Sequence, residues 1–133
     1  MATKIVFIVE KTSTGFSAFA QDFETYPVGT TGKNFTELKS NIIEALNLHN
    51  EHQGLKAVTA DDVIIQVDIP QFFEFYNVIN AKALSERIGM NPTVLSLYVN
   101  GHRKPSAKQV SKILTGIKEI GKELSSLDMV MPI

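Results

Sequence analysis

Residues 81–103 read AKALSERIGMNPTVLSLYVNGHR, and this stretch predicts two short helices joined by a tight turn. Its first half carries an apolar stripe at spacings of three and four, the period of a helix with one buried face, at Ala81, Leu84 and Ile88. Gly89 then suits a left-handed cap, because glycine takes that conformation without a steric cost. We therefore expect the first helix to run from about residue 80 to residue 88.

A second helix is expected over residues 92–99. Asn91 followed by Pro92 is a strong start signal, because a proline at the first helical position gives up an amide N–H that has no partner there. The pattern predicts that Leu95 and Val99 are buried and that Tyr98 is partly buried. The face left to solvent would carry Thr93, Ser96, Leu97 and Asn100, and Gly101 would end the helix.

This arrangement closely resembles the helix-turn-helix of the phage-repressor type, whose recognition helix ends in Asn-Gly before a basic, proline-containing loop. The resemblance implies base contacts near the start of the second helix and phosphate contacts from its end and from the loop. An ordinary helical hairpin inside a core is the alternative. The residues expected at a DNA interface are Asn91, Pro92, Thr93, Ser96, Leu97, Asn100, His102, Arg103, Lys104, Ser106 and Lys108.

The first half of the chain predicts a small sheet with one packed helix. Apolar or alternating runs indicate strands at 5–9, 16–20, 26–31 and 63–69. Between the third and fourth strands, Asn34 and Glu37 form a variant capping box that opens a helix reaching about His52. The fold class is therefore α+β, with a βββαβ sheet domain followed by an all-α domain.

The remaining segments are expected to be helical. Residues 70–77 are too rich in aromatic side chains for a free linker, so we expect a short helix that opens the second domain. Ser106 and Gln109 indicate a capping box before an apolar stripe of about 20 residues. The expected domains are residues 1–69, residues 70–128 and an apolar tail at 129–133.

Charge is distributed unevenly between the halves of a chain whose net charge is −1. Residues 1–78 carry five Lys/Arg and ten Asp/Glu (5 − 10 = −5), whereas residues 79–133 carry eight and four (8 − 4 = +4). A basic half can approach phosphate, and an acidic half suits a basic protein. Chance drift of solvated charges is the alternative explanation.

Catalysis, cofactors and metals are not expected. The chain has no cysteine for a thiolate site, and no clustered carboxylates are evident in the sheet. His49 and His52 are three residues apart but lack an obvious third ligand, so we interpret them as ordinary helix-end histidines. No signal peptide or membrane-spanning run is apparent, so a cytoplasmic location is expected.

The order of elements resembles the HicB antitoxin family, above all in the helix motif FTELKSNIIEAL of residues 35–46. The resemblance covers essentially the whole chain. It implies a degenerate ribonuclease-H-like sheet that binds and neutralises a small basic mRNA-cleaving toxin, HicA, and a C-terminal module that represses the shared operon.

Two other functions stay open. One is a stand-alone transcriptional repressor with a ligand-sensing N-terminal domain, and the other is a nuclease with a DNA-targeting module. Because each chain carries a single reading helix, and repressors of this kind read two half-sites, we expect a homodimer or a higher oligomer on double-stranded operator DNA.

Overall fold

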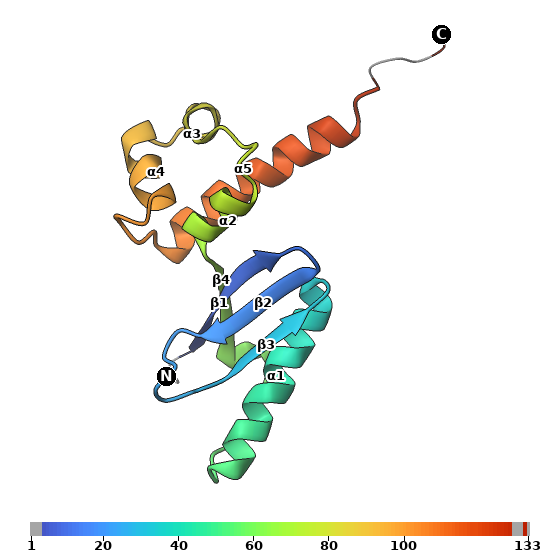
Figure 1. The fold of residues 1–133 in the computed structure, drawn as a ribbon, viewed down its shortest axis with the longest axis vertical. Coiled ribbons are helices and arrows are strands. Elements are labelled where there is room, and N and C mark those ends of the chain that lie inside the picture. Colours follow the sequence, from blue (N-terminus) through green and yellow to red (C-terminus); the bar gives the residue numbers. More distant parts are fainter. Residues whose placement is uncertain (1–3, 129–131, 133) are drawn as a thin grey trace. The chain divides into compact units, whose positions relative to one another are not determined.

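The structure, a computed structural model, describes residues 4–128 and residue 132 (Figure 1). Over these residues the chain is an α+β protein with a four-stranded mixed sheet and five α-helices. It divides into two compact units, Met1–Phe75 and Tyr76–Ile133. The α+β class predicted from the sequence is confirmed.

The first unit contains the sheet, which has the strand order β3-β2-β1-β4. The pairs β1–β2 and β2–β3 are antiparallel, whereas β4 runs parallel to β1. The predicted βββαβ order is therefore correct. The elements are β1 (Ile5–Thr12), β2 (Gly15–Ala20), β3 (Gly29–Gly32), α1 (Phe35–His52), a 3₁₀ turn (Ala60–Asp62), β4 (Val63–Val67) and α2 (Ile69–Phe75).

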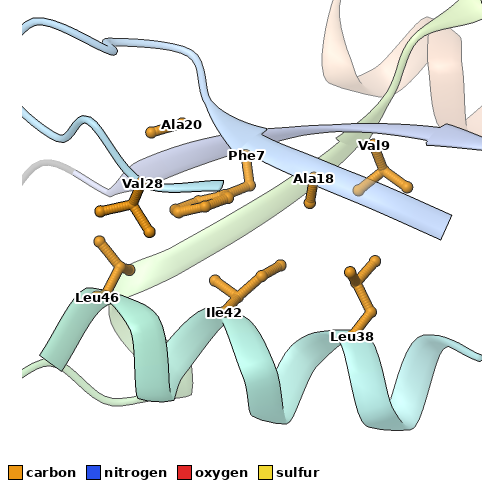
Figure 2. Packing of buried hydrophobic residues seen from close by; sticks show 8 residues of the cluster. All are labelled: Phe7, Val9, Ala18, Ala20, Val28, Leu38, Ile42 and Leu46. Atoms are coloured by element: carbon orange, nitrogen blue, oxygen red, sulfur yellow. The ribbon is translucent and has the colours of Figure 1, made fainter. Parts of the chain in front are cut away.

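The core of this unit lies between one face of the sheet and α1. Leu38, Ile42 and Leu46 are almost fully buried, and Figure 2 shows them rising from the helix toward the strands. Opposite them, alternate residues of β1 and β2 point to the same side, as the pleat of a strand requires, and Val28 completes the cluster. The buried strand residues are Phe7, Val9, Ala18 and Ala20.

The N-terminus of α1 is capped as the sequence predicts, but only in part. Asn34 Oδ1 accepts a hydrogen bond from the Glu37 N–H at 2.8 Å. Glu37 is exposed, and no bond from its carboxylate back to Asn34 is seen in the described part of the chain. The predicted capping box is therefore half formed, because the Asn34 side chain alone already satisfies an unpaired helical donor.

All four predicted strands have different limits in the structure. The first extends to Thr12 instead of residue 9, and the second begins at Gly15 instead of residue 16. The third strand is Gly29–Gly32 instead of 26–31, because the Tyr26 N–H donates to the Asp22 carbonyl in a turn at 2.9 Å. The fourth strand ends at Val67 instead of residue 69. Asp68 Oδ1 accepts from the Gln71 N–H at 3.2 Å, and this contact starts α2.

Helix α2 lies with the first unit, whereas the sequence suggested that it opens the second. The Gln71 side chain accepts from the Lys11 N–H at 2.9 Å and donates to the Lys11 carbonyl at 2.7 Å, so it pairs with β1 as another strand would. The expected boundary after residue 69 is therefore corrected to one between Phe75 and Tyr76.

The second unit contains α3 (Ala81–Ile88), α4 (Pro92–Val99) and α5 (Ala107–Ser125). These helices match the three predicted in this part of the chain within one or two residues. The expected tail at 129–133 lies outside the described residues apart from Pro132. Among the described residues, no helix combines the length and apolar character needed to cross a membrane.

We expect the substitution Ile42→Ala to lower the free energy of unfolding of the first unit by about 2–5 kcal/mol, because it empties the centre of the core. The matched control is Leu48→Ala on the same helix, whose side chain is 61% exposed; its effect should stay within about 0.5 kcal/mol. Urea titration followed by the NMR signals of the first unit measures both. Equal effects would contradict this description of the core.

Candidate nucleic-acid interface

Helices α3 and α4 are joined by a three-residue turn. Asn80 caps the start of α3 by accepting from the Ala83 N–H at 3.0 Å. Gly89 ends α3 in the left-handed conformation, with φ of 70° and ψ of 33°, where a side chain is disfavoured. Met90 is buried, and its N–H donates to the Ser85 carbonyl at 2.9 Å. These contacts fix the direction in which α4 leaves the turn.

Helix α4 begins at Pro92 and is capped by Asn91. Asn91 Oδ1 accepts from the Thr93 N–H at 2.8 Å and from the Val94 N–H at 3.4 Å. Leu95 and Tyr98 are buried on the inner side of the helix. Tyr98 is buried more deeply than the sequence suggested, and Val99 is only half-buried. The inner face of α4 is thus centred on Leu95 and Tyr98.

The outer face of α4 is polar and exposed over its first turns. Pro92, Thr93, Ser96 and Asn100 are all exposed. Ser96 Oγ accepts from Asn100 Nδ2 at 3.2 Å, which joins two of the predicted contact residues in one pair. A polar, uncharged helix start of this kind can present hydroxyl and amide groups to base edges.

Leu97 differs from the prediction because its side chain is half-buried. Its backbone has a second role that the sequence did not reveal. The Leu97 carbonyl accepts from the His102 N–H at 2.9 Å and from the Arg103 N–H at 3.2 Å. These bonds hold the loop after α4 against the end of that helix. The Leu97 side chain is therefore only partly available for the predicted contact with DNA.

The loop after α4 is basic and exposed. His102, Arg103 and Lys104 all face solvent, next to the start of α5. The second unit carries eight Lys/Arg and four Asp/Glu (8 − 4 = +4). Lys108 is exposed in the first turn of α5 and adds to this surface. A positive loop beside a polar helix start is suited to phosphate.

Ser106 has a structural role at the start of α5. Its Oγ accepts from the Gln109 N–H at 3.2 Å. The predicted return bond from the Gln109 side chain is not formed, and Gln109 Oε1 is buried without a hydrogen-bond partner in the described residues. The second predicted capping box is therefore also half formed.

Helix α5 packs against α3. A Cβ placed on Gly116 would lie 2.3 Å from Ile88 Cγ2, so the two helices approach closely at this glycine. An ion pair between Arg87 and Glu123 joins the same helices farther along. Ser85, which the sequence analysis did not single out, is fully buried in α3 and donates through Oγ to the Lys82 carbonyl at 2.6 Å.

The eleven predicted contact residues all lie in the second unit, and five of them form two contrasting groups. Asn91 and Ser106 use their side-chain oxygens as helix caps. Thr93, Arg103 and Lys104 are exposed and make no side-chain hydrogen bond within the described residues. The second group is the stronger candidate for direct contact with a ligand.

The first unit has a separate open groove of about 820 Å³ between α1 and β4. Its lining is mainly apolar and includes Ile42, Ile43, Val58, Val63 and Ile65. No group of three or more His, Asp or Glu side chains that could hold a metal ion occurs in the described part of the chain. No known protein-family model and no curated protein matches this chain.

We expect Gly116→Ala to destabilise the second unit by about 1–3 kcal/mol, because the new methyl group would overlap Ile88. Gly121→Ala is the matched control on the same helix. A Cβ at Gly121 meets nothing within 4 Å, so alanine there should stabilise by up to about 1 kcal/mol. Thermal unfolding of both variants measures the difference, and destabilisation of equal size would disprove the close approach of α3 and α5.

Proposed function

We propose that this chain is a DNA-binding repressor and antitoxin, with α3 and α4 as a helix-turn-helix and the sheet unit as its protein-binding part. The observation that carries the proposal is the exposed polar start of α4 beside the basic loop of residues 101–104. Helix-turn-helix proteins place this part of the second helix in the major groove.

In this proposal, side chains at the start of α4 contact bases, and side chains at its end, in the following loop and in α5 contact the DNA backbone. Thr93 and Ser96 contact base edges, where a hydroxyl can donate or accept. Pro92 offers only apolar contact, for example with a thymine methyl group. Arg103, Lys104 and Lys108 bind phosphate groups, and the uncharged side chain of Asn100 adds a contact to the DNA backbone. Phosphate contacts position the helix, and base contacts select the sequence.

The sheet unit supports a protein-binding role through its charge. It carries five Lys/Arg and ten Asp/Glu (5 − 10 = −5), a balance that repels nucleic acid and attracts a basic protein. Its βββαβ order resembles the degenerate ribonuclease-H-like domain of HicB antitoxins, and the partner proposed is a HicA-type mRNA-cleaving toxin. Masking a toxin is binding, so the chain itself is proposed to be no enzyme and to need no cofactor.

A second copy of the chain is part of the proposal. Each chain has one recognition helix, which contacts one half-site. An operator with two half-sites therefore requires a homodimer or a higher oligomer. The end of α5 and the residues directly after it offer apolar surface for such pairing, because Leu124 and Leu127 are more than half exposed, at 61% and 55%. Leu124 continues the helical spacing of Ile117 and Ile120, and Leu127 follows the end of the helix.

One observation favours a second candidate function. The groove of about 820 Å³ in the sheet unit is large enough for a small molecule, so the chain could be a stand-alone repressor that senses a ligand there. A ligand that raises the unfolding temperature and changes operator affinity would favour this function over the antitoxin.

The DNA-binding part is tested by fluorescence anisotropy on DNA from directly upstream of the chain's own gene. At physiological salt we expect the full chain to bind this DNA about 10³-fold or more tightly than a scrambled duplex of the same length. The tested DNA should extend far enough to hold two half-sites. Equal affinity for both duplexes would refute operator recognition by the chain alone.

Two substitutions separate phosphate contacts from base contacts. Arg103→Ala should weaken binding to both duplexes and reduce the slope of log affinity against log salt by about one for each chain in the complex, and so by about two for a dimer. Thr93→Ala should leave the slope unchanged. It should reduce the difference in binding free energy between operator and scrambled DNA by about 1–3 kcal/mol. The same anisotropy titrations serve both variants, and each is the control for the other. Reversed results would contradict the assigned roles.

The antitoxin part is tested with a HicA-type mRNA-cleaving toxin, the partner that the proposal names. We expect the purified full chain to form a stable complex with it and to stop its cleavage of mRNA. Arg103→Ala should neutralise it as well as the unaltered chain does, because that residue belongs to the DNA interface. Mixtures that show no complex by gel filtration, with cleavage continuing, would refute the antitoxin role.

A further inference from the structure

Among the residues that the structure describes, no strand pairs with the outer edge of β4. The strand pairs with β1 on one side only, as the end member of the sheet. The Asp68 N–H donates to the Val9 carbonyl at 2.9 Å, so it points toward β1. Because backbone groups alternate in direction along a strand, the N–H and C=O groups of Ile65 and Val67 point outward.

The opposite edge of the sheet differs from this one. Strand β3 is only four residues long and has a glycine at each end. Its outward Thr31 carbonyl accepts from Asn41 Nδ2 of α1 at 2.8 Å. Proteins commonly protect edge strands by such means, by shortness or by a covering side chain. No such contact is seen at Ile65 or Val67 in the described residues.

The apolar groove lies directly beside the unprotected edge. Val63 and Ile65 point into it from β4, and Ile42 and Ile43 line it from α1. Its far wall is the segment before the 3₁₀ turn. Asn47 holds that segment in place, because its side chain accepts from the Val58 N–H at 2.7 Å and donates to the Val58 carbonyl at 3.1 Å.

An extended chain fits such a site better than a helix or a small molecule alone. A strand added to β4 would bond with the outward groups of Ile65 and Val67, and every second side chain would enter the groove. Main-chain bonds would then provide affinity, and the groove would select apolar residues at alternate positions. Lys39 also lines the groove, with its aliphatic stem available for contact.

The charges at the ends of β4 indicate which kind of strand could pair with its outer edge. Asp61 and Asp62 precede the strand and Asp68 follows it. If a second copy paired antiparallel along the whole of β4, centred on Ile65, Asp62 of each copy would face Asp68 of the other, since 62 + 68 equals twice 65. Like charges directly opposite each other destabilise a sheet. A strand with basic residues at both ends has no such conflict.

We propose that the outer edge of β4 and the adjoining groove bind an extended segment of a partner protein, with apolar residues at alternate positions and Lys or Arg at both ends. This inference deepens the proposed function and rests on it in one respect, that the sheet unit binds a basic protein. It does not require that partner to be a ribonuclease.

The probe is the peptide acetyl-Lys-Val-Thr-Val-Thr-Val-Lys-amide, titrated into the full chain and followed by NMR and amide hydrogen exchange. The Ile65 and Val67 amides should exchange rapidly in the free chain and become protected on binding. In a peptide strand antiparallel to β4, the valines that enter the groove also direct their N–H groups to the edge. A peptide N-methylated at its three valines therefore loses these bonds and should bind at least about tenfold more weakly. A peptide with Glu in place of both Lys residues should also bind at least about tenfold more weakly.

Matched variants test the same surface from the side of the protein. Val67→Pro should retain the fold, because the N–H that it removes points to solvent, and should abolish peptide binding. Ile43→Glu places a charge in the groove and should also abolish binding, whereas Leu48→Glu, at an exposed site on the same helix, should not. The amide spectrum of each variant reports whether the fold is retained.

Several results would overturn the inference. These are no binding up to the solubility limit of the peptide, binding that N-methylation or Ile43→Glu leaves unchanged, and protection of the Ile65 and Val67 amides that rises with protein concentration in the absence of peptide. The last result would identify a second copy as the occupant. A small molecule that saturates the groove without protecting these amides, in a chain that does not bind the peptide, would identify a ligand site instead.

The docking surface and the antitoxin role can be disproved independently of each other. If a HicA-type toxin is neutralised equally well by Val67→Pro, Ile43→Glu and the unaltered chain, the docking surface is wrong and the antitoxin role stands. If the peptide binds at β4 as described but no toxin is neutralised, the docking surface stands and the antitoxin role is wrong.

Discussion

The packing of α1 on one face of the sheet is the contact on which the first unit depends. The stripe of Leu38, Ile42 and Leu46 covers the inner side of the strands and excludes water from the core (Figure 2). The helix makes most of its contacts with β3 and β2, at one side of the sheet. As a result it covers β3 well and leaves room beside β4. The same contact thus creates both the core and the open groove.

Asparagine side chains fix the ends of several helices and the position of one loop. Asn34, Asn80 and Asn91 each cap a helix, and Asn47 fixes the wall of the groove. Each satisfies backbone groups that would otherwise lack a partner at a helix end or in a loop. The direction of α4 and the form of the groove therefore depend on amide groups as much as on apolar packing.

The two units combine opposite charges with different kinds of surface. In the second unit, the polar start of α4 lies close to a loop with Arg103 and Lys104, as binding to a polyanion requires. In the first, acidic residues stand at the ends of an apolar edge strand. This separation is compatible with the two partners proposed for the chain, a nucleic acid and a basic protein, because the charge of each surface suits one of them and repels the other.

The sequence by itself determined the order of the elements, the N-terminal caps of α1, α4 and α5, and the glycine turn between α3 and α4. These features depend on residues within a few positions of each other, and local hydrogen bonds and helical periodicity are sufficient to specify them. The candidate contact residues near Thr93 and Arg103 were found for the same reason, since they lie in one continuous stretch.

Only the tertiary structure decided which contacts form between distant residues. The Gln71 side chain pairs with Lys11, 60 residues earlier, and this contact attaches α2 to the sheet unit. Leu97 is more buried than its local pattern indicated, and Ser85 is fully buried although no local pattern marked it. The groove beside β4 likewise has walls from three separate segments. No local pattern encodes such a surface, because its form depends on where packing places each segment.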